Sequence, residues 1–432
     1  MSDAKVYVID GARTPFLKAR GPANEFSAGD LAVAAARPLL ARAPFAPEQI
    51  DEIIVGCVIP APDEANIARI IGLRLGCGKA VPAFTVQRNC ASGLQALASA
   101  RERIAQGRAH LVLAGGTEAM SRAPIQWNNA MAGWLAAMMR SRNPVARLRA
   151  IGRFRLSHLV PVYTLLLGLT DPLVKLNMGQ TAEIIAHRFG ITRSEQDAYA
   201  LSSHQRLAAA YDTGLMRGEV EPLFDSRGRI VQEDTGLRRD SDMDQLAKLR
   251  PVFDRKYGSV TSGNSSQVTD GAAMLVLASE AAVQRYGLQV LGELLGEEWA
   301  GVDPGQMGLG PVHAVAKLIS RFGLQMEDIR QMELNEAFAA QVLACQAAWA
   351  SPEYARDELG VDAPPGPMDP ARLNMDGGAV AIGHPVGASG ARIVLHLLRS
   401  LRRHGGGLGV ATLCIGGGQG GAMLVRVPGE SK

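Results

Sequence analysis

The sequence predicts an α/β fold made of two similar halves. The tripeptide Ala-Ser-Gly occurs at 91–93 and again at 388–390, and each copy precedes a helical segment and then a strand that ends in paired glycines. A second matching pair of segments, 47–55 and 326–334, lies upstream of the two copies. We therefore expect an internal duplication, and helices that alternate with strands favour parallel pairing within each half.

The individual elements follow from local patterns. Leu94, Leu97 and Ile104 fall on one side at helical spacing, with Arg101 elsewhere, and Gly107 supplies a helix stop. The first expected elements are therefore strands at 6–9, 53–55 and 111–113 and a helix at 94–106. Their counterparts late in the chain are a helix at 391–403 and a strand at 409–413.

The composition is that of a packed soluble chain. With 432 residues, 47% of them hydrophobic, and 48 glycines, the chain is long enough for two or three domains. A net charge of +3 is too small to indicate nucleic-acid binding. No apolar run reaches the ~20 residues of a membrane span, and a strand-like segment at 6–9 follows Met1 closely. We therefore expect a cytoplasmic protein without a signal peptide.

A segment of different character, 121–254, separates the two halves. Its first part, 122–170, contains no acidic residue and interleaves arginines with Trp127, Trp134 and Phe154. Such a basic, apolar stretch could lie on an anionic membrane or a partner protein; the alternative is an ordinary insertion whose arginines meet ligand phosphates or solvent. The arginines are Arg140, Arg142, Arg147, Arg149, Arg153 and Arg155.

The second part of this segment is predicted to be helical. A helix is expected at 179–189, and Thr192 and Glu195 form a capping box that opens another helix ending at Tyr211.

Two of the five cysteines stand in an unusual context. Cys90 and Cys414 each lie where an apolar run meets a glycine-containing turn, and His384 lies in a glycine-rich run between them. Free backbone N–H groups, and for Cys90 the start of a helix, should lower a thiol pKa and favour thiolate chemistry. A histidine in such a turn completes a nucleophile-and-base pair.

For any single cysteine or histidine, the alternative is a purely structural role. Most cysteines are small buried hydrophobes, and Cys57, Cys77 and Cys345 are interpreted that way. The other histidines are interpreted as structural, and Glu336 as a buried structural partner. Because no Cys-x-x-C pair occurs, neither zinc nor a disulfide framework is expected, and no metal site is predicted.

Five motifs, in order, resemble those of the thiolase family. They are Asn89-Cys90-Ala91-Ser92-Gly93, Gly115-Gly116-Thr117-Glu118-Ala119-Met120-Ser121, Asn335-Glu336-Ala337-Phe338, Gly383-His384-Pro385-Val386-Gly387 and Cys414-Ile415-Gly416-Gly417-Gly418. The resemblance runs nearly the whole length of the chain.

This resemblance implies the thiolase fold. Two pseudo-symmetric βαβαβαββ halves would pack into a five-layered α-β-α-β-α structure with an inserted loop domain. The expected N-terminal half comprises 1–120 with 255–286 and carries Cys90. The inserted loop domain, which would cover coenzyme A, spans 121–254, and the C-terminal half spans 287–432.

The same resemblance implies a role for each catalytic candidate. Cys90 would be the nucleophile that takes the acyl group as a thioester, and His384 the base that removes its proton. Cys414 would be the second acid/base, acting at the α-carbon of acetyl-CoA. Asn335 would hold a water for one oxyanion site, shared with His384, while the backbone amides of Cys90 and Gly416 would form the other.

For coenzyme A, the resemblance implies a set of binding positions. Arg238 would contact the nucleotide end and Ser266 the pantetheine; the alternative for Arg238 is a solvated surface residue. No dinucleotide-binding fingerprint or P-loop occurs, so coenzyme A and acyl-CoA are expected as substrates, with no cofactor. The full set is Met178, Arg238, Phe253, Ser266, Ala337, Phe338 and Gly416.

Within the family, the middle segment is similar to the long-chain β-oxidation thiolases, including the β subunit of the trifunctional enzyme. The motifs around Asn335 and Cys414, however, resemble acetoacetyl-CoA thiolases, so chain length stays open. The expected function is reversible cleavage of 3-ketoacyl-CoA in β-oxidation, or condensation of two acetyl-CoA to acetoacetyl-CoA. We expect a homodimer or homotetramer; a β-oxidation partner subunit and peripheral membrane contact through 122–170 are further options.

Two other functions share the fold. One is a catalytically inactive thiolase-like lipid carrier or membrane scaffold, which the complete set of two cysteines and a histidine disfavours. The other is a decarboxylating ketosynthase, which would use two histidines with one cysteine.

Overall fold

The computed structural model describes residues 4–19 and 24–429. One mixed sheet runs through the body in the order β12-β13-β14-β11-β1-β10-β5-β3-β4, with β2 paired to β10. Its strands are β1 (Val6–Arg13), β2 (Leu17–Lys18), β3 (Glu52–Gly56), β4 (Ala83–Val86), β5 (Leu111–Ala119), β10 (Thr269–Ser279), β11 (Gly292–Gly301), β12 (Ile329–Leu334), β13 (Gly407–Ile415) and β14 (Gln419–Val427).

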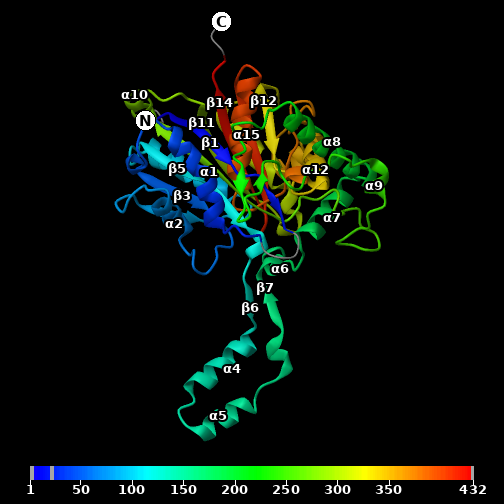
Figure 1. Cartoon of the computed structure of the whole chain (residues 1–432). Coiled ribbons are helices and arrows are strands. Elements are labelled where there is room, and N and C mark those ends of the chain that lie inside the picture. The colour runs from blue at the N-terminus through cyan, green and yellow to red at the C-terminus, as the bar shows by residue number, and fades with distance from the viewer. Residues whose placement is uncertain (1–3, 20–23, 430–432) are drawn as a thin grey trace.

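Helices pack against the outer face of each half of the sheet, and two further helices lie between the halves (Figure 1). Those of the body are α1 (Ala28–Arg42), α2 (Ile67–Arg74), α3 (Ser92–Ala105), α10 (Glu280–Tyr286), α11 (Gly310–Phe322), α12 (Ala339–Ala350), α13 (Pro352–Tyr354), α14 (Ala379–Ile382) and α15 (Ser389–Arg403).

The two halves have the same strand topology, as the repeat predicted. In the first half β3 pairs in parallel with both β4 and β5, and β10 is antiparallel to β5 and β1. In the second half β12 pairs in parallel with β13, and β14 is antiparallel to β13 and β11. A single parallel bridge, Met332 to Leu373, stands in the place of β4. The parallel pairing that the alternation of helices and strands favours is therefore found in both halves, and each half closes with antiparallel strands.

The halves join where β1 pairs with β11, at Tyr7–Glu293 and Val8–Gly292. Three buried hydrophobic clusters then mark the layers: one under α1 and α2, one around α3 and α15 between the two halves, and one under α11 and α12. The five-layered arrangement is thereby confirmed.

Helix α3 shows how its sequence fits the central layer. Leu94, Leu97 and Ile104 are buried, as their spacing predicted. Arg101, expected away from this face, is buried too, because its guanidinium pairs with Glu297 at 2.7 Å. Buried charges are tolerated when they are paired in this way.

Glycines allow the N-termini of α3 and α15 to touch. A Cβ on Gly390 would lie 2.4 Å from the backbone N of Leu94, and one on Gly116 would lie 1.9 Å from the carbonyl O of Gly387. No real side chain fits at such distances. The repeated Ala-Ser-Gly therefore marks one of the close backbone contacts between the two halves.

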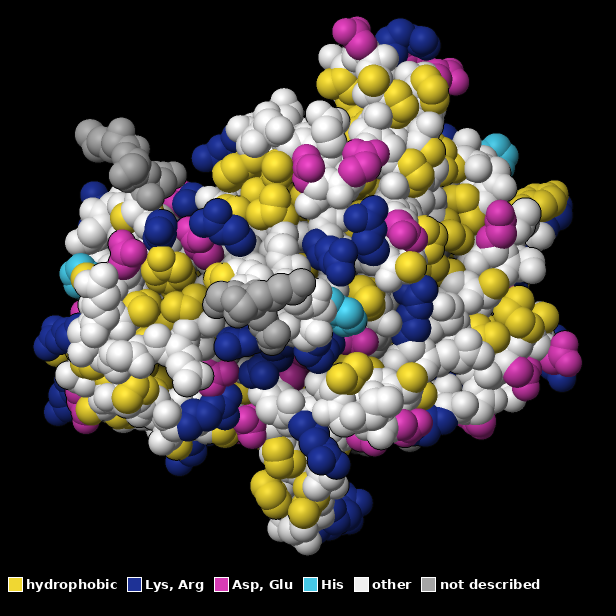
Figure 2. Space-filling view, turned by 90° about the horizontal axis from the view of Figure 1, so that it is seen from above, with side chains coloured by type: hydrophobic (Ala, Val, Ile, Leu, Met, Phe, Trp, Pro, Cys, Tyr) yellow, Lys and Arg dark blue, Asp and Glu magenta, His cyan; other side chains and the backbone are white. Residues whose placement is uncertain are grey.

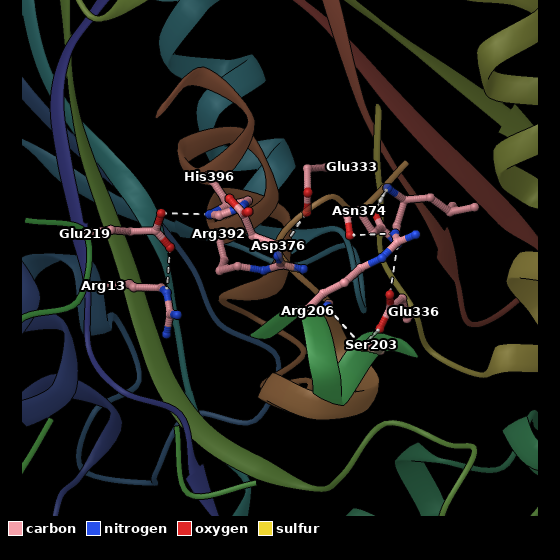
Figure 3. Close-up of polar contacts among 12 residues, drawn as sticks. Arg13, Ser203, Arg206, Glu219, Glu333, Glu336, Asn374, Asp376, Arg392 and His396 are labelled. Atoms are coloured by element: carbon pink, nitrogen blue, oxygen red, sulfur yellow. Dashed lines mark hydrogen bonds and ion pairs between the residues drawn. The ribbon is translucent and has the colours of Figure 1, made fainter. Parts of the chain in front are cut away.

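A buried ionic network ties α15 to the first half (Figure 3). Arg13 pairs with Glu219 at 2.8 Å and with Asp234 at 2.7 Å, and Glu219 also accepts from His396 Nδ1 at 2.8 Å. Burial alone would lower the pKa of His396, but Glu219 and Asp376 raise it to about 10, so the imidazole is charged at neutral pH.

The segment between β5 and β10 forms an arm and a helical lobe. Strands β6 (Ile125–Trp127) and β7 (Pro161–Tyr163) pair as a ribbon that carries α4 (Asn129–Arg140) and α5 (Pro144–Ile151) away from the body (Figure 1). The lobe contains α6 (Thr164–Gly168), α7 (Met178–Arg188), α8 (Arg193–Asp212), β8 (Leu223–Phe224), β9 (Ile230–Val231) and α9 (Met243–Ala247).

Helix α8 begins at the predicted capping box, in which Thr192 and Glu195 bond each other's backbone N–H.

Within the described ranges, no helix is both long and apolar enough to cross a bilayer. The face of the body in Figure 2 mixes basic and acidic side chains.

Replacing Gly116 by alanine should lower the thermal midpoint of unfolding. The added methyl would press against the backbone of Gly387, and overpacking of this kind costs ~1–3 kcal/mol. The matched control is Gly301→Ala, whose Cβ would meet no atom within 4 Å. Equal midpoints for the two variants would contradict the close contact between the halves.

Candidate active site

Cys90 lies in a rigid turn between β4 and α3. Asn89 adopts a left-handed conformation (φ 44°), and its Nδ2 donates to the carbonyl O of Gly416 at 2.8 Å. The Ser92 hydroxyl donates to the Asn89 carbonyl at 2.8 Å and accepts from the Arg88 N–H at 2.9 Å. The turn is thereby fixed to both its own helix and the opposite half.

Cys414 lies near the end of β13, before the tight glycine turn that leads into β14. Gly417 and Gly418 adopt positive φ angles of 89° and 77° in that turn. This arrangement matches the strand–turn–strand expectation, and it places the N–H of Gly416 against the Cys90 thiol, where it acts to lower the thiol pKa.

His384 lies between α14 and α15, and the serine that begins α15 orients its ring. Nδ1 lies 2.6 Å from Ser389 Oγ, and that hydroxyl donates its only proton to the Pro385 carbonyl at 3.1 Å. Ser389 therefore accepts from Nδ1–H, so the lone pair of the neutral imidazole is on Nε2. Nε2 is buried without a hydrogen-bond partner among the described residues.

The three candidate side chains face one cavity. A cavity of about 340 Å³ is lined by Cys90, His384 and Cys414 together. Five of the seven positions expected to bind coenzyme A line the same cavity: Met178, Phe253, Ser266, Ala337 and Phe338.

Three expected site residues lie outside that lining. Gly416 lines a second cavity, of about 410 Å³, which also contains Cys90. Asn335 is fully buried, and neither its Oδ1 nor its Nδ2 has a partner among the described residues. Arg238 lines neither cavity, although Gly236, two residues earlier, accepts from Gln267 in the cavity wall.

The cavity wall depends on a glycine and two aromatic rings. Phe253 and Phe338 pack edge to face, with ring centroids 6.1 Å apart. A Cβ on Gly179 would lie 2.2 Å from the Phe253 ring, so the first turn of α7 must have a glycine there. Asn177 caps this helix and positions Met178 at its first residue.

The expected low thiol pKa was wrong for this state of the protein. Burial raises the pKa of Cys90 and outweighs the N–H groups of Gly416 and of Cys90 itself, which act to lower it. Burial and the neighbouring Cys90 raise the pKa of Cys414 well above its usual value. Burial, then Arg392, lowers the pKa of His384 to about 4. At neutral pH both thiols are therefore protonated and the imidazole is neutral.

Two positioning residues were missed by the sequence reasoning. Ser389 sets the tautomer of His384, as described above. Glu118 is fully buried and accepts from the N–H groups of Val58 at 2.9 Å, Ile59 at 3.0 Å and Gly387 at 3.1 Å, which ties the loop after His384 to the first half. A carboxylate inside a largely apolar, glycine-rich strand was the available signal for Glu118.

Glu336, interpreted as structural, is buried and accepts from the hydroxyls of Tyr199 at 2.9 Å and Ser203 at 2.7 Å (Figure 3). Within the described residues, no group of three His, Cys, Asp or Glu side chains is arranged to hold a metal ion.

Comparison with known proteins places this geometry in a family. Residues 6–281 match the model of the thiolase N-terminal domain, and residues 288–427 match that of the thiolase C-terminal domain. A 3-ketoacyl-CoA thiolase of Yersinia enterocolitica is 40% identical over 429 residues, covering 98% of this chain and 97% of that protein.

Solved structures agree over the same length. Human mitochondrial 3-ketoacyl-CoA thiolase in complex with CoA is 37% identical, with a TM-score of 0.84 and 98% of each chain covered. The acetyl-CoA acetyltransferase of Bacillus anthracis is 34% identical, with a TM-score of 0.84, and the match covers 98% of this chain and 100% of that protein's chain. The chain belongs to the thiolase family.

Proposed function

We propose that the protein is a thiolase that cleaves 3-ketoacyl-CoA with coenzyme A, giving acetyl-CoA and an acyl-CoA shortened by two carbons, as a step of β-oxidation. The same chemistry in reverse condenses two acetyl-CoA to acetoacetyl-CoA. The observation that carries this proposal is the meeting of Cys90, His384 and Cys414 at one cavity. An inactive lipid carrier has no need of that complete set.

In the first step the thiol of Cys90 attacks the 3-keto carbon. His384 takes the thiol proton on Nε2, which bears the lone pair because Ser389 accepts from Nδ1–H. The neutral thiol and imidazole of the free enzyme imply that this transfer accompanies the attack. The N–H groups of Cys90 and Gly416 would bind the resulting alkoxide.

In the second step the bond between C2 and C3 breaks, leaving the acyl group on Cys90 as a thioester. The electron pair passes to the acetyl-CoA portion, and Cys414 protonates its α-carbon. The raised pKa of Cys414 keeps this proton available at neutral pH. His384, now protonated, donates to the thioester oxygen together with a water held by Asn335, whose buried side chain needs such a partner.

In the last step the thiol of a second coenzyme A attacks the acyl-Cys90 thioester. Its proton goes to the Cys414 thiolate, and Cys90 leaves as a thiolate that recovers the proton from His384. Coenzyme A would lie along Met178, Phe253, Ser266, Ala337 and Phe338, with Arg238 toward its nucleotide end. No cofactor enters the scheme.

Changing Cys90 to serine should abolish the acyl-enzyme. A hydroxyl is a far weaker nucleophile and leaving group, so thiolysis should fall by several orders of magnitude. Mass spectrometry after incubation with acetoacetyl-CoA should detect an added acetyl group in the wild type and in the Cys77→Ser control, where the cysteine is buried away from the cavity. Normal turnover by Cys90→Ser would refute the assignment.

Changing Ser389 to alanine should lower kcat by roughly tenfold with little change in KM. The buried Nδ1–H would lose its acceptor, which costs ~1–3 kcal/mol and frees the wrong tautomer. Ser400→Ala is the control, because that hydroxyl is buried in the same helix and has no partner among the described residues. Equal kcat values in the two variants would argue against the positioning role.

The pH dependence of kcat/KM in the wild type tests the protonation state of His384. A pKa of about 4 should hold kcat/KM nearly constant between pH 7 and pH 5.5. If His384 had the ordinary pKa of ~6.5, kcat/KM would fall about tenfold over that range, since only the neutral form accepts the proton. A tenfold loss would contradict the buried neutral imidazole.

We also propose that the arm, α4 to α5, makes peripheral contact with an anionic membrane surface. Met139 is 88% exposed and Leu148 69% exposed, and four arginines surround a shallow hollow between the two helices. Each basic residue near an anionic surface contributes ~1 kcal/mol. A β-oxidation partner subunit is the other candidate for this surface. The arginines are Arg140, Arg142, Arg149 and Arg153.

Removing the arm should abolish flotation with anionic vesicles. Residues 128–160 can be replaced by a short turn, because β6 and β7 already pair as a hairpin and the cavity-lining segment after 163 is retained. The wild type should float with vesicles rich in phosphatidylserine and less with phosphatidylcholine alone. Equal flotation of the shortened variant would remove the membrane proposal, while its thiolysis of acetoacetyl-CoA serves as the folding control.

We further propose that the protein forms a homo-oligomer and is located in the cytoplasm. Strand β4 ends the sheet, and within the described residues it pairs on one side only, with β3. Asn66 Nδ2 donates to the Ala83 carbonyl on the other edge of β4, but no strand pairs there among the described residues, and such an edge beside the Cys90 turn is suited to pairing with a second copy.

A further inference from the structure

A third cavity lies between the C-terminal ends of α1 and α15 and the loop that follows α10 (Figure 1). Its volume is about 800 Å³, and it shares no lining residue with the two cavities at Cys90. This volume falls within the ~300–1,000 Å³ typical of sites for small organic ligands. The proposed thiolase reaction uses none of the residues that line this cavity.

The floor of this third cavity is apolar. Leu39, Phe45, Val276 and Leu291 line it, and all four are buried. Gln289 lines the same cavity and is exposed, so its amide can both donate to a ligand and accept from it. A ligand that fits these residues therefore combines an apolar body with a polar edge.

Arginines surround this floor. Among the described residues that line the cavity, Asp10 is the one acidic residue. It pairs with Arg42 at 2.5 Å and with Arg399 at 3.2 Å, and Glu221, outside the lining, also pairs with Arg42 at 2.9 Å. Two carboxylates thus balance two guanidinium groups. The arginines of the lining are Arg42, Arg217, Arg399, Arg402 and Arg403.

Two of these five arginines have no carboxylate. Arg403 pairs with Asp376. In contrast, the Arg217 side chain has no hydrogen-bond or ion-pair partner among the described residues, and Arg402 donates only to the Val290 carbonyl there, at 3.2 Å. One solvated arginine is ordinary on a protein surface, but two uncompensated guanidinium groups at one apolar cavity are suited to binding an anion.

We infer that this cavity binds a phosphate monoester with an apolar body, of the class of the nucleoside monophosphates. Such a phosphate carries close to two negative charges at neutral pH, which matches the two uncompensated guanidinium groups, and arginine binds phosphate oxygens in a planar fork. The base would lie over the apolar floor, with its polar edge toward Gln289. A fatty carboxylate has one charge and no polar edge, so it matches the same residues less well.

The test measures binding of adenosine 5′-monophosphate to the full-length protein by isothermal titration calorimetry. Changing Arg217 and Arg402 together to serine should raise the Kd at least tenfold, because charge-assisted hydrogen bonds to the phosphate are lost. The control changes Arg108 and Arg227 to serine, which removes the same charge from two exposed arginines outside all three cavities. Equal Kd values in the two double variants would overturn the inference, as would the absence of binding by the wild type.

Photolabelling locates the ligand without any substitution. 8-Azidoadenosine 5′-monophosphate should label the cavity-lining segments 39–45 or 287–291. Labelling confined to segments that line the cavities at Cys90 would contradict the inference. Should the double variant not fold, Arg217→Ser removes a side chain that has no partner to lose, and a Kd equal to that of the wild type is then the contradicting result.

Coenzyme A as a competitor identifies the source of the phosphate, because its nucleotide end also carries a phosphate monoester. Loss of labelling at 39–45 or 287–291 would show that the cavity accepts the nucleotide end of coenzyme A. Retention of that labelling would show that the cavity selects free nucleotides. Both results presuppose labelling of the cavity, so both support the inference.

Discussion

Backbone meets backbone where the two halves of the chain converge, because glycines keep side chains out of the contact. Gly93 and Gly390 bring the starts of α3 and α15 together, and Gly116 lets the loop at Gly387 lie against β5. Cys90 lies just before one of these helices and His384 just before the other. The relative position of nucleophile and base is thus fixed by close packing of backbone against backbone, and Glu118 also binds the same loop through the Gly387 N–H.

Much of this arrangement could be predicted from local pattern and repetition. The helix expected at 94–106 is observed at Ser92–Ala105, and the one expected at 391–403 at Ser389–Arg403. Periodicity and capping are local properties, so they survive in the fold. That the three reactive side chains share a cavity followed only from the family resemblance, since no local pattern tells which distant segments meet.

The failures have a common physical cause, which is burial by partners far away in the sequence. Arg101 is polar by type but pairs with Glu297, 196 positions later. The turn around Cys90 has the N–H groups that lower a thiol pKa, yet desolvation by the surrounding halves outweighs them. The role of Ser389 likewise depends on where its hydroxyl lies relative to a ring, and a sequence alone does not contain that geometry.

The position of the inserted segment has an evolutionary consequence. The segment leaves the body after β5 and returns at β10, and Ala119 pairs directly with Asp270 in the sheet. Its entry and exit are therefore neighbours, and a segment of any length can be accommodated there without disturbing strand register. Relatives can lengthen, trim or replace this module, and so acquire new substrates and docking sites, while the reactive centre is inherited intact.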